Sequence, residues 1–404
     1  MGRSLILLIC GFLSIFAYLR VNLSKVSEAS IDNYLFHYKK IISKNISNSA
    51  LNFAIQKLSR NRELRTTLNH ISFSGGFFDV FFKERPEIGD DVLEIKAVSN
   101  YYNLIDSSIA VVRIRNISDR FSRYSYFSNT EPMIYFATGD TLYGPVHTNG
   151  QFHFTGVPVF YGLVSSVSPV YSTAGFTDPE FYGGTDFGRN AIKLPIDLSS
   201  LISAAQDGGF AVSGSELWLS FKSDGTFDYK IGSYGEWNNS SLSEINGVIY
   251  SDKNIHIRGI VSGKVTICSM KDIIIEDDIV YADNPLDNPE SEDLLGIVAK
   301  RNVIVKDNPQ NRIKCEIDGS IMAVDGSFRA ENIYFTPPGR LSLLGGIIQK
   351  TRGPVGTTLP SGYKKYYKYD DRLEYIFPPY YPIADGSLEG LPAKVKIEII
   401  SWWE

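Results

Sequence analysis

The stretch Gly144-Pro-Val-His-Thr-Asn-Gly-Gln-Phe-His-Phe-Thr-Gly156 decides the fold, because a second stretch, Gly247-Val-Ile-Tyr-Ser-Asp-Lys-Asn-Ile-His-Ile-Arg-Gly259, aligns with it without a gap. The two share their terminal glycines, an apolar third position, a Ser/Thr-Asx pair and an apolar-His-apolar triplet. Each copy has the pattern of a short strand, a tight polar turn and a second strand of alternating character. We interpret each copy as one corner of a repeated coil.

The same outline returns further along the chain. It is clear in residues 320–330 and looser in residues 268–275 and 296–305. A strand pair this short cannot bury its apolar face alone, so the copies must stack on one another. The predicted fold class is mainly β with a long N-terminal α-helix, in which a small β-sheet subdomain precedes a parallel β-helix or β-solenoid over residues 129–404.

The repeat pattern lapses at about residues 194–240, where we expect an insertion that caps or flanks the coil. Residues 198–205 predict a short helix. Residues 216–221 and 226–230 alternate in the manner of strands around Asp224-Gly225, which predicts a hairpin.

The front of the chain differs in composition from the rest. No Gly or Pro occurs from Phe12 to Ser74, and because these residues break helices, one continuous helix can form there. Through Arg65 there are ten Lys/Arg and three Asp/Glu, a net of +7, which leaves −12 for the remainder of a chain whose total is −5. The acidic remainder argues against a nucleic-acid partner, and 43% hydrophobic with 21% charged residues excludes wholesale disorder.

An apolar segment begins the chain. Residues 5–19 carry no charge and, with Val21 and Leu23, approach the roughly 20 residues that a helix needs to cross a bilayer. We therefore expect a transmembrane signal-anchor over residues 1–23, with residues 4–23 in contact with the lipid bilayer. A cleaved secretory signal is the alternative, although no small-x-small cleavage site follows the segment.

Two regions separate this segment from the repeats. Apolar residues continue at helical spacing, which predicts an amphipathic stalk helix over residues 24–66 that is continuous with the span. Residues 67–128 predict a small pilin-like β-sheet region, packed on the helix, and a linker. The strand-like runs are residues 77–82, 92–98 and 109–114.

The order of these parts is similar to that of pilins and pseudopilins: a short basic start, an apolar half-helix, an amphipathic half-helix and a β-rich part. Gly2 could precede a prepilin-peptidase cut, although Arg3 is unlike the usual residue there. Leu7 stands where most major pilins have Glu, which weakens polymerisation through that residue. A plain single-pass anchor with a coiled stalk is the alternative.

The chain also resembles a bacterial envelope family, the domain of unknown function 4900 proteins, which are often described as PilX-like pilus-assembly proteins. The resemblance implies a membrane-anchored, exported protein with a pilin-like N-terminus, and it implies no activity. The segments that carry it are residues 139–150, 156–162, 369–373, 378–379 and 401–403, together with residues 45–50 in the amphipathic helix.

The orientation in the membrane has two opposing indications. Arg3 alone precedes the span, whereas Arg20, Lys25, Lys39 and Lys40 follow it, and this count favours a cytoplasmic C-terminal part. We nevertheless expect export, because long domains can be translocated despite flanking charge and the remainder has the character of an envelope protein. The predicted location is a single pass through the bacterial inner membrane, with the C-terminal domain in the periplasm or at the cell surface.

Three histidines of the repeats are candidate metal ligands. His147 and His153 lie six residues apart on adjacent strands of one corner, and His256 occupies the place equivalent to His153. Imidazoles that face each other across a solenoid could bind a metal, but no carboxylate or thiolate recurs at ligand spacing. We therefore predict isolated histidines, no metal site and no cofactor.

Acidic residues offer a candidate catalytic cluster. Glu276, Asp277 and Asp278 are similar to the acidic clusters of β-helical polysaccharide lyases and hydrolases. A solvated turn after the strand at residues 273–275 explains the same residues, and we prefer it. Because no phosphate loop, GxSxG, HExxH or CxxC motif is present, we predict no catalytic and no cofactor-binding residues.

Other polar residues of the repeats have structural explanations. Asn149, Asp252 and Asp325 fall at matching corners, where Asx side chains bond their own backbone. Cys268 and Cys315 could form a disulfide only if stacked coils bring their α-carbons within about 6 Å of each other, and buried free thiols are the alternative.

Lysines alternate with aromatic residues near the C-terminus, in residues 363–369, and residues 377–382 are rich in aromatics and proline. Such a pattern can bind nucleic acid or sugar faces through stacking and cation–π contacts. An aromatic C-terminal cap that seals the open end of the solenoid requires fewer assumptions, and we predict that cap.

The sequence therefore favours a non-enzymatic, membrane-anchored and exported pseudopilin-like protein that serves as a structural, assembly or adhesion module. The expected partners are the bilayer, type IV pilus or secretion-like assembly components, a second copy of the chain or a surface polysaccharide, and no nucleic acid. One alternative is a membrane-tethered β-helical carbohydrate-active enzyme, a lyase or hydrolase. Another is a bactofilin-like polymerising scaffold.

Overall fold

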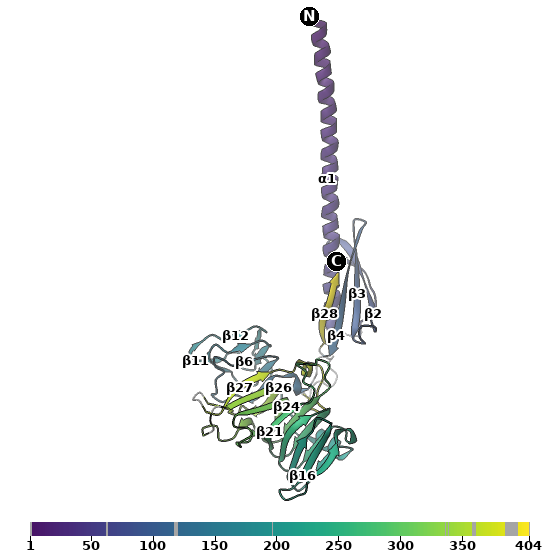
Figure 1. Cartoon of the computed structure of the whole chain (residues 1–404). Helices are drawn as coiled ribbons and strands as arrows, with labels where there is room; N and C mark the ends of the chain where they lie inside the picture. The colour runs from purple at the N-terminus through teal and green to yellow at the C-terminus, as the bar shows by residue number, and fades with distance from the viewer. Residues whose placement is uncertain are drawn as a thin grey trace. The chain divides into compact units, whose positions relative to one another are not determined.

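The computed structural model describes residues 2–61, 64–116, 120–195, 197–335, 337, 339–357, 361–383 and 395–403 (Figure 1). The chain forms two compact units. Unit 1 comprises Met1–Asn116 and Pro392–Glu404, and unit 2 comprises Ile117–Leu391. The fold is mainly β with one long N-terminal helix, as predicted.

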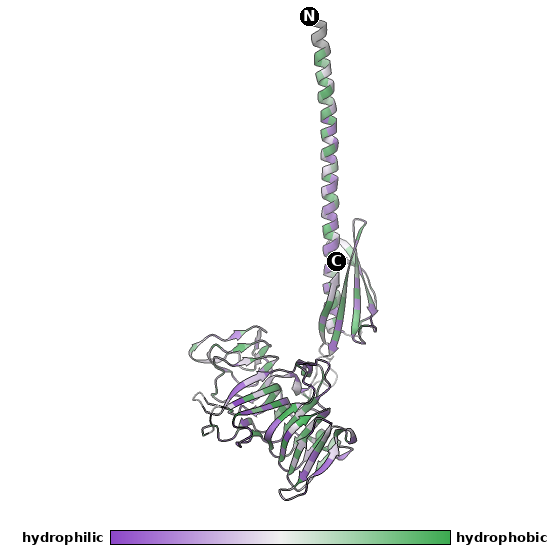
Figure 2. Ribbon diagram, in the orientation of Figure 1, coloured by the Kyte–Doolittle hydropathy of each residue, from purple (hydrophilic) through white to green (hydrophobic). Residues whose placement is uncertain are grey.

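Helix α1 spans Gly2–Arg60 without interruption, in agreement with the absence of Gly and Pro after Phe12. Apolar side chains from Leu8 to Ile41 are exposed on it, and Figure 2 shows many apolar residues along its first half. Within the described part of the chain, α1 is the one helix long and apolar enough to cross a membrane.

An antiparallel sheet packs against the last third of α1. Its order is β1-β2-β3-β4-β28. The strands are β1 (Leu68–Phe73), β2 (Gly76–Glu84), β3 (Val92–Tyr101), β4 (Leu104–Asn116) and β28 (Val395–Trp403). The buried helix face is apolar, and its members lie three or four residues apart, as one helical face requires: Ile46, Ala50, Leu51, Ala54 and Leu58.

Two serine pairs fix the register of α1 on this sheet. The hydroxyl of Ser43 lies 2.9 Å from that of Ser99 on β3. The hydroxyl of Ser47 lies 2.7 Å from that of Ser108 on β4. All four side chains are buried, so each pair satisfies groups that would otherwise lose water without replacement.

Strand β28 corrects the predicted domain boundary. Residues 395–403 were expected within a domain spanning 129–404, but they pair with β4 in the sheet of unit 1. Val395, Ile397 and Ile399 alternate with charged residues, which is a strand pattern of period two. That pattern predicts a strand, but it does not specify which distant sheet the strand will join.

Unit 2 is built on parallel ladders of short strands. The longest ladder is continuous through ten strands, each parallel to its neighbours. In spatial order from β14 it contains β14 (Phe210–Val212), β18 (Val248–Ser251), β20 (Lys264–Ser269), β22 (Leu294–Ala299), β24 (Lys314–Ala323), β26 (Gly339–Thr351), β5 (Tyr126–Thr130), β7 (Val146–Thr148), β10 (Val164–Ser166) and β13 (Thr185–Phe187).

A second parallel ladder runs beside it. Its strands are β15 (Leu217–Phe221), β19 (Ile255–Val261), β21 (Ile273–Tyr281), β23 (Val303–Val305) and β25 (Phe328–Ala330). The antiparallel strands β16 (Thr226–Ile231) and β17 (Asn238–Ser241) extend it beyond β15. Because β14 and β15 pair in parallel with β18 and β19, the region expected as an insertion contributes strands to both ladders.

The remaining strands form shorter parallel pairings. β27 (Tyr363–Lys368) pairs with the first half of β26. β6 (Thr141–Leu142), β9 (Val159–Phe160) and β12 (Glu180–Phe181) form one small sheet, and β8 (His153–Gly156) and β11 (Ser172–Thr177) form another. The helical elements of unit 2 are α2 (Ser199–Gln206), η1 (Phe121–Arg123), η2 (Leu242–Glu244) and η3 (Asp371–Glu374).

The first strands of the two aligned copies, β7 and β18, occupy equivalent places in the longest ladder, whereas the second strands, β8 and β19, lie in different sheets. The apolar third position, Val146 in one copy and Ile249 in the other, lies in a single column that the strand register defines. The column is buried along its length between these two residues: Ile249, Ile267, Ile297, Ile321, Ile347, Tyr126 and Val146. The apolar third position of the sequence repeat therefore corresponds to one buried residue per strand in this column.

The opposite face of the same ladder is also covered. Its column includes Tyr250, Cys268, Met322 and Ile348, which pack with Leu201 and Ala205 of α2 and with Phe121, Tyr124 and Tyr381. Because this face is covered as well, both faces of the sheet are buried. The strands are therefore apolar at successive positions instead of alternating between apolar and polar residues.

Candidate functional site

His147 lies in this covered column and is fully buried. Its Nε2 lies 3.0 Å from Asn149 Oδ1 and its Nδ1 lies 2.9 Å from the hydroxyl of Ser165. Because an amide oxygen only accepts, Nε2 carries the proton and Nδ1 accepts from Ser165. The ring also stacks on Phe127, with 5.4 Å between centroids. His147 is a packed, neutral core residue.

The burial of His147 predicts a pH dependence of stability. Burial lowers the pKa of its imidazole to about 4, from about 6.5 in an unfolded chain. Between pH 6.5 and pH 4 the unfolded chain therefore binds a proton that the native chain does not bind. The free energy of unfolding falls over this range as the pH drops, by up to about 3 kcal/mol.

The measurement is urea unfolding of the wild type and of His147→Gln at pH 7.5, 5.5 and 4.5. The stability gap between the two proteins should narrow toward low pH, because glutamine does not titrate. A gap that stays constant with pH would contradict a buried neutral imidazole.

The other two histidines of the repeats occupy different surroundings. His153 on β8 bonds through Nδ1 to the hydroxyl of Ser172, and its ring meets Tyr135 edge-on. His256 on β19 lies among carboxylates of the second ladder. Over the described ranges of the chain, no group of three or more His, Cys, Asp and Glu side chains could hold a metal ion.

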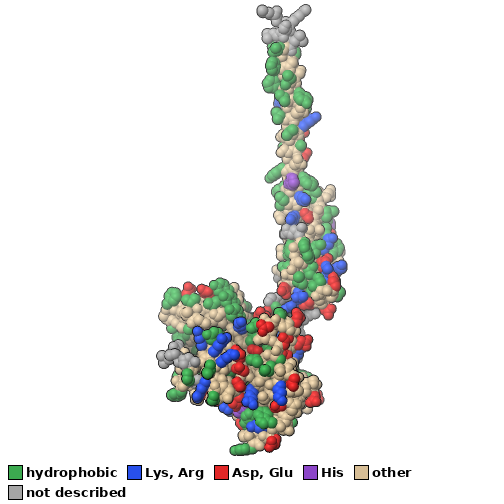
Figure 3. All heavy atoms as spheres, in the orientation of Figure 1, with side chains coloured by type: hydrophobic (Ala, Val, Ile, Leu, Met, Phe, Trp, Pro, Cys, Tyr) green, Lys and Arg blue, Asp and Glu red, His purple; other side chains and the backbone are tan. Residues whose placement is uncertain are grey.

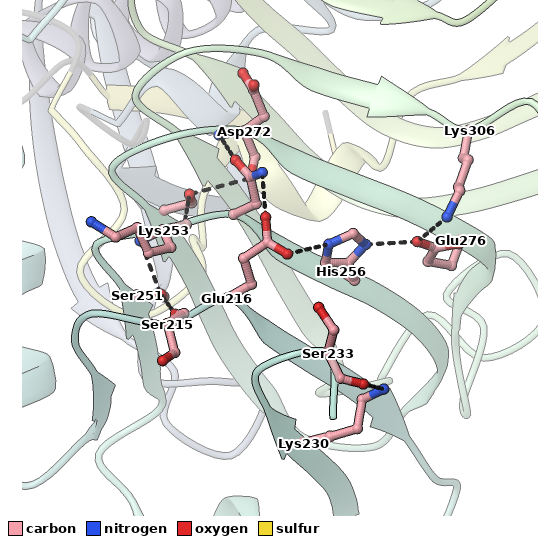
Figure 4. Close-up of polar contacts among 12 residues, drawn as sticks. Ser215, Glu216, Lys230, Ser233, Ser251, Lys253, His256, Asp272, Glu276 and Lys306 are labelled. Atoms are coloured by element: carbon pink, nitrogen blue, oxygen red, sulfur yellow. Dashed lines mark hydrogen bonds and ion pairs between the residues drawn. The ribbon is translucent and has the colours of Figure 1, made fainter. Parts of the chain in front are cut away.

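His256 is the centre of a charged cluster that links neighbouring strands (Figure 4). Its Nδ1 lies 2.6 Å from Glu276 Oε1, and its Nε2 lies 3.8 Å from Glu216 Oε2. Lys306 Nζ approaches the same Glu276 oxygen at 2.7 Å. Burial raises the pKa of Glu276, but the bonds from His256 and Lys306 outweigh it, so that the pKa is lowered and the carboxylate is charged.

An aromatic residue covers the ring of His256. Trp218 on β15 stacks on it with 4.4 Å between centroids and 7° between planes. Lys230 Nζ lies 4.6 Å from the centroid of the Trp218 ring, and its amine donates to the Ser233 carbonyl. The stack follows from the strand register, which places Trp218 directly beside His256.

This arrangement bears on the carbohydrate-active alternative. A glycosidase holds its two carboxyl groups roughly 5 to 10 Å apart with the sugar or a water between them. Here the imidazole of His256 occupies the space between Glu216 and Glu276 (Figure 4). The cluster is built as a cross-link between strands rather than as an open pair of carboxylates.

The neighbouring acids Asp277 and Asp278 lie at a register shift in β21, between Ile275 and Ile279. Asp278 accepts a bond from the backbone N–H of Glu316 at 2.7 Å, and Asp277 accepts one from the N–H of Asp278 at 2.9 Å. Burial raises the pKa of Asp278 above its ordinary value. Both carboxylates thus bond backbone at a corner.

The structure also shows where the predicted corner residues and the two cysteines of unit 2 lie. Asn149 and Asp252 are equivalent in the ladder, but Asp325 lies one residue further along its corner than predicted, because Ala323 is the residue in register with Ser251. Cys268 and Cys315 are buried free thiols. Burial raises the pKa of the Cys268 thiol to about 12, so it is unreactive.

A groove of about 660 Å³ in unit 2 was not foreseen from the sequence. Its lining includes residues 133–142, 352–357, 361–365 and Tyr367. Arg352 is one of the lining residues, and its Nη1 is 3.4 Å from Glu131 Oε2 and 3.0 Å from the Ile134 carbonyl. Its guanidinium also lies 3.8 Å from the centroid of the Phe136 ring.

Two ion pairs lie at this groove, and the first is that of Arg352 with Glu131. Glu131 also accepts a bond from the hydroxyl of Tyr126, and burial raises the pKa of that phenol well above 10. Lys365 Nζ lies 2.7 Å from Asp140 Oδ1. Both ion pairs join segments more than 200 residues apart, so no local pattern in the sequence could have revealed them.

One missed feature did leave a sequence signal. The dipeptide Tyr-Gly recurs at Tyr143, Tyr161 and Tyr182. The three rings stack in order, with centroids 4.9 and 5.2 Å apart and nearly parallel planes. The glycines that follow are in direct backbone contact, because a side chain on Gly162 would meet the carbonyl of Gly144 and one on Gly183 would meet Gly162.

The fold and these contacts define a mainly β protein with one long N-terminal helix, whose parallel strand ladders enclose buried columns and are joined by charged contacts. Residues 100–168, which include the first copy of the repeat, match the family model of the domain of unknown function DUF4900. The resemblance to that family is thereby confirmed over this stretch.

The chain was also compared with curated proteins and with solved structures. No curated protein matches the chain. Among solved structures, the crystal structure of the competence-associated pilin ComZ from Thermus thermophilus aligns with 90% of this chain and 97% of its own, at 10% identity and a TM-score of 0.37. A TM-score of this size does not establish a common fold.

Proposed function

We propose that the chain is a pilin-like envelope protein, anchored in the bacterial inner membrane through α1 and exported, which acts as a structural, assembly or adhesion module without catalytic activity. The observation that carries the proposal is the division of α1. Its apolar side chains from Leu8 to Ile41 have no protein to pack against, whereas those from Ile46 to Leu58 are buried on a sheet. Such a division suits a helix whose first part lies in lipid.

The proposal includes a β-solenoid in unit 2. Its support is the set of parallel ladders, in which each strand pairs in register with a strand from another turn of the chain. The continuous buried column from Ile249 to Ile347 is the interior that stacked coils would share. Such a rigid, elongated body suits assembly or adhesion better than it suits a mobile active site.

The absence of catalysis is proposed from the partners of the candidate residues. His147 is a packed neutral imidazole, and His256 is held between carboxylates. Asp277 and Asp278 bond backbone groups. These contacts support a structural role for the strongest candidate residues.

Protease accessibility tests the location. Proteinase K is added to intact cells, to cells with a permeabilised outer membrane and to fully lysed cells, and unit 2 is followed with an antibody. Digestion after permeabilisation of the outer membrane alone is the expected result. Protection of unit 2 there, with digestion only after lysis, would place it in the cytoplasm and contradict export. A periplasmic and a cytoplasmic marker protein serve as controls.

A further inference from the structure

An uncompensated basic strip lies on the outer surface of β26 and β27. Lys364, Tyr366 and Lys368 alternate along β27 and are exposed, so they share one face of the strand. Arg340 of β26 is exposed beside them, because the register pairs it with Lys364. Figure 3 shows Lys and Arg side chains gathered over the region of β27. We refer to Arg340, Lys364, Tyr366 and Lys368 as the basic strip.

The cations of the strip differ from their neighbours in having no acidic partner. Lys314 is paired with Glu316 at 2.7 Å, and Lys365 with Asp140 at 2.7 Å. Among the residues that the structure describes, no carboxylate lies within ion-pair distance of Arg340, Lys364 or Lys368. Three positive charges therefore stand together, although unit 2 lies in the acidic part of the chain.

Tyr366 organises two of these charges. The Arg340 guanidinium lies 4.3 Å from the centroid of its ring, and Lys364 Nζ lies 5.6 Å from it. The ring holds both cations at the surface, and the cations in turn occupy its face. The strip is thus preorganised, and its aromatic face is not free to stack on a ligand.

The stacked tyrosines continue the strip on the next coils. A side chain on Gly144 would meet the ring of Tyr369, so the turn that carries Tyr143 lies beside the end of β27. In this stack Tyr161 is covered on both faces and Tyr143 and Tyr182 on one face each, and all three side chains are exposed. One carboxylate lies here, Glu180, and it accepts a bond from the hydroxyl of Tyr182.

These features select one class of ligand. Adjacent strands place cations about 4.8 Å apart, and alternate residues of β27 place them about 6.6 Å apart, so a ligand with repeated negative charges fits better than a single ion. Base stacking needs free ring faces, and few are left here because cations lie on Tyr366 and Tyr161 is covered on both faces, whereas phenol edges and hydroxyls suit the hydroxyl groups of sugars. We propose that the basic strip, extended by Tyr143, Tyr161 and Tyr182, binds a linear acidic polysaccharide that carries carboxylates on successive sugars.

Binding by the purified full chain in detergent micelles tests the proposal. The probes are fluorescein-labelled polygalacturonate, neutral dextran and a 20-nucleotide oligo(dT). We expect polygalacturonate to bind, dextran to bind negligibly, and the affinity for polygalacturonate to fall with rising salt. The triple variant Arg340→Gln/Lys364→Gln/Lys368→Gln should bind polygalacturonate on the order of 30-fold more weakly or worse, because three charges are removed.

A matched control removes the same number of charges elsewhere. Lys222, Lys253 and Lys264 are exposed lysines of unit 2 that form ion pairs, and their triple change to glutamine should leave affinity within about twofold. Tyr366→Leu retains all three cations, and it should weaken binding about threefold by releasing Arg340 and Lys364 from the ring. Urea unfolding of each variant shows whether unit 2 is intact.

Three outcomes would overturn the proposal. Equal losses in the strip variant and the control variant, or no binding of polygalacturonate, would show that the strip is not the site. Tighter binding of oligo(dT), lost in the strip variant, would assign the surface to nucleic acid instead. The biological setting rests on the proposed exported location, but this assay uses purified protein, so its failure and a failure of export are distinguishable.

Discussion

Gly162→Ala is expected to destabilise unit 2 by more than about 4 kcal/mol, a large share of the roughly 5–15 kcal/mol that typically stabilises a folded domain. A β-carbon at this position would lie 1.7 Å from the carbonyl oxygen of Gly144 and 2.1 Å from its carbonyl carbon. Both atoms belong to the backbone that follows β6, which pairs with β9, so neither can move aside without separating these two strands. Gly144 itself is pressed against the ring of Tyr369 on its other side.

Gly184→Ala is the matched control for this change. A β-carbon there meets nothing within 4 Å, and its φ of +78° predicts only the strain of a left-handed alanine, about 1 kcal/mol. Both variants are made in the full chain, and unfolding is followed by far-UV circular dichroism in urea. If the Gly162→Ala protein were as stable as the Gly184→Ala protein, the backbones of Gly144 and Gly162 would not be in contact.

The second large effect is expected from Arg352→Met. The Glu131 side chain is completely buried, and that of Arg352 is only 7% exposed. Methionine retains most of the volume but leaves the Glu131 carboxylate as an uncompensated buried charge, which costs about 3–5 kcal/mol. The measured quantity is the free energy of unfolding in urea at pH 7.

Two comparisons separate the charge from the packing. Adding Glu131→Gln to Arg352→Met should restore at least about half of the lost stability, because the unpaired charge is then gone. Lys264→Met breaks the exposed pair with Glu292 and should change stability by less than about 1 kcal/mol. If the double variant is no more stable than Arg352→Met alone, packing rather than charge explains the loss.

The local features of the fold could be predicted from the sequence. The long helix followed from the absence of Gly and Pro after Phe12, and α1 spans Gly2–Arg60. The gap-free match of residues 144–156 with 247–259 predicted equivalent strands, and Val146 and Ile249 lie in one column of the ladder. A buried column restricts each of its positions to apolar residues, which is why it left a readable pattern.

The pairing between distant segments could not be predicted in the same way. Parallel pairing requires that each strand has neighbours, but it does not specify which strands adjoin when the chain returns on itself. The contact of β26 with β5, the sheet position of β28 and the pair of Arg352 with Glu131 all depend on that choice. The cluster around His256 could not be predicted for a related reason, because Glu216 and Glu276 approach His256 from two different segments of the chain.

The pairing of β26 with β5 determines when unit 2 can be completed during synthesis. β5 ends at Thr130, but the strand that covers its free edge begins at Gly339, so about 200 residues must leave the ribosome in between. At a typical elongation rate of about 5–20 residues per second, that edge stays open for 10 seconds or more. An open strand edge is a template for wrong pairing, so a chaperone would have its greatest effect in this interval.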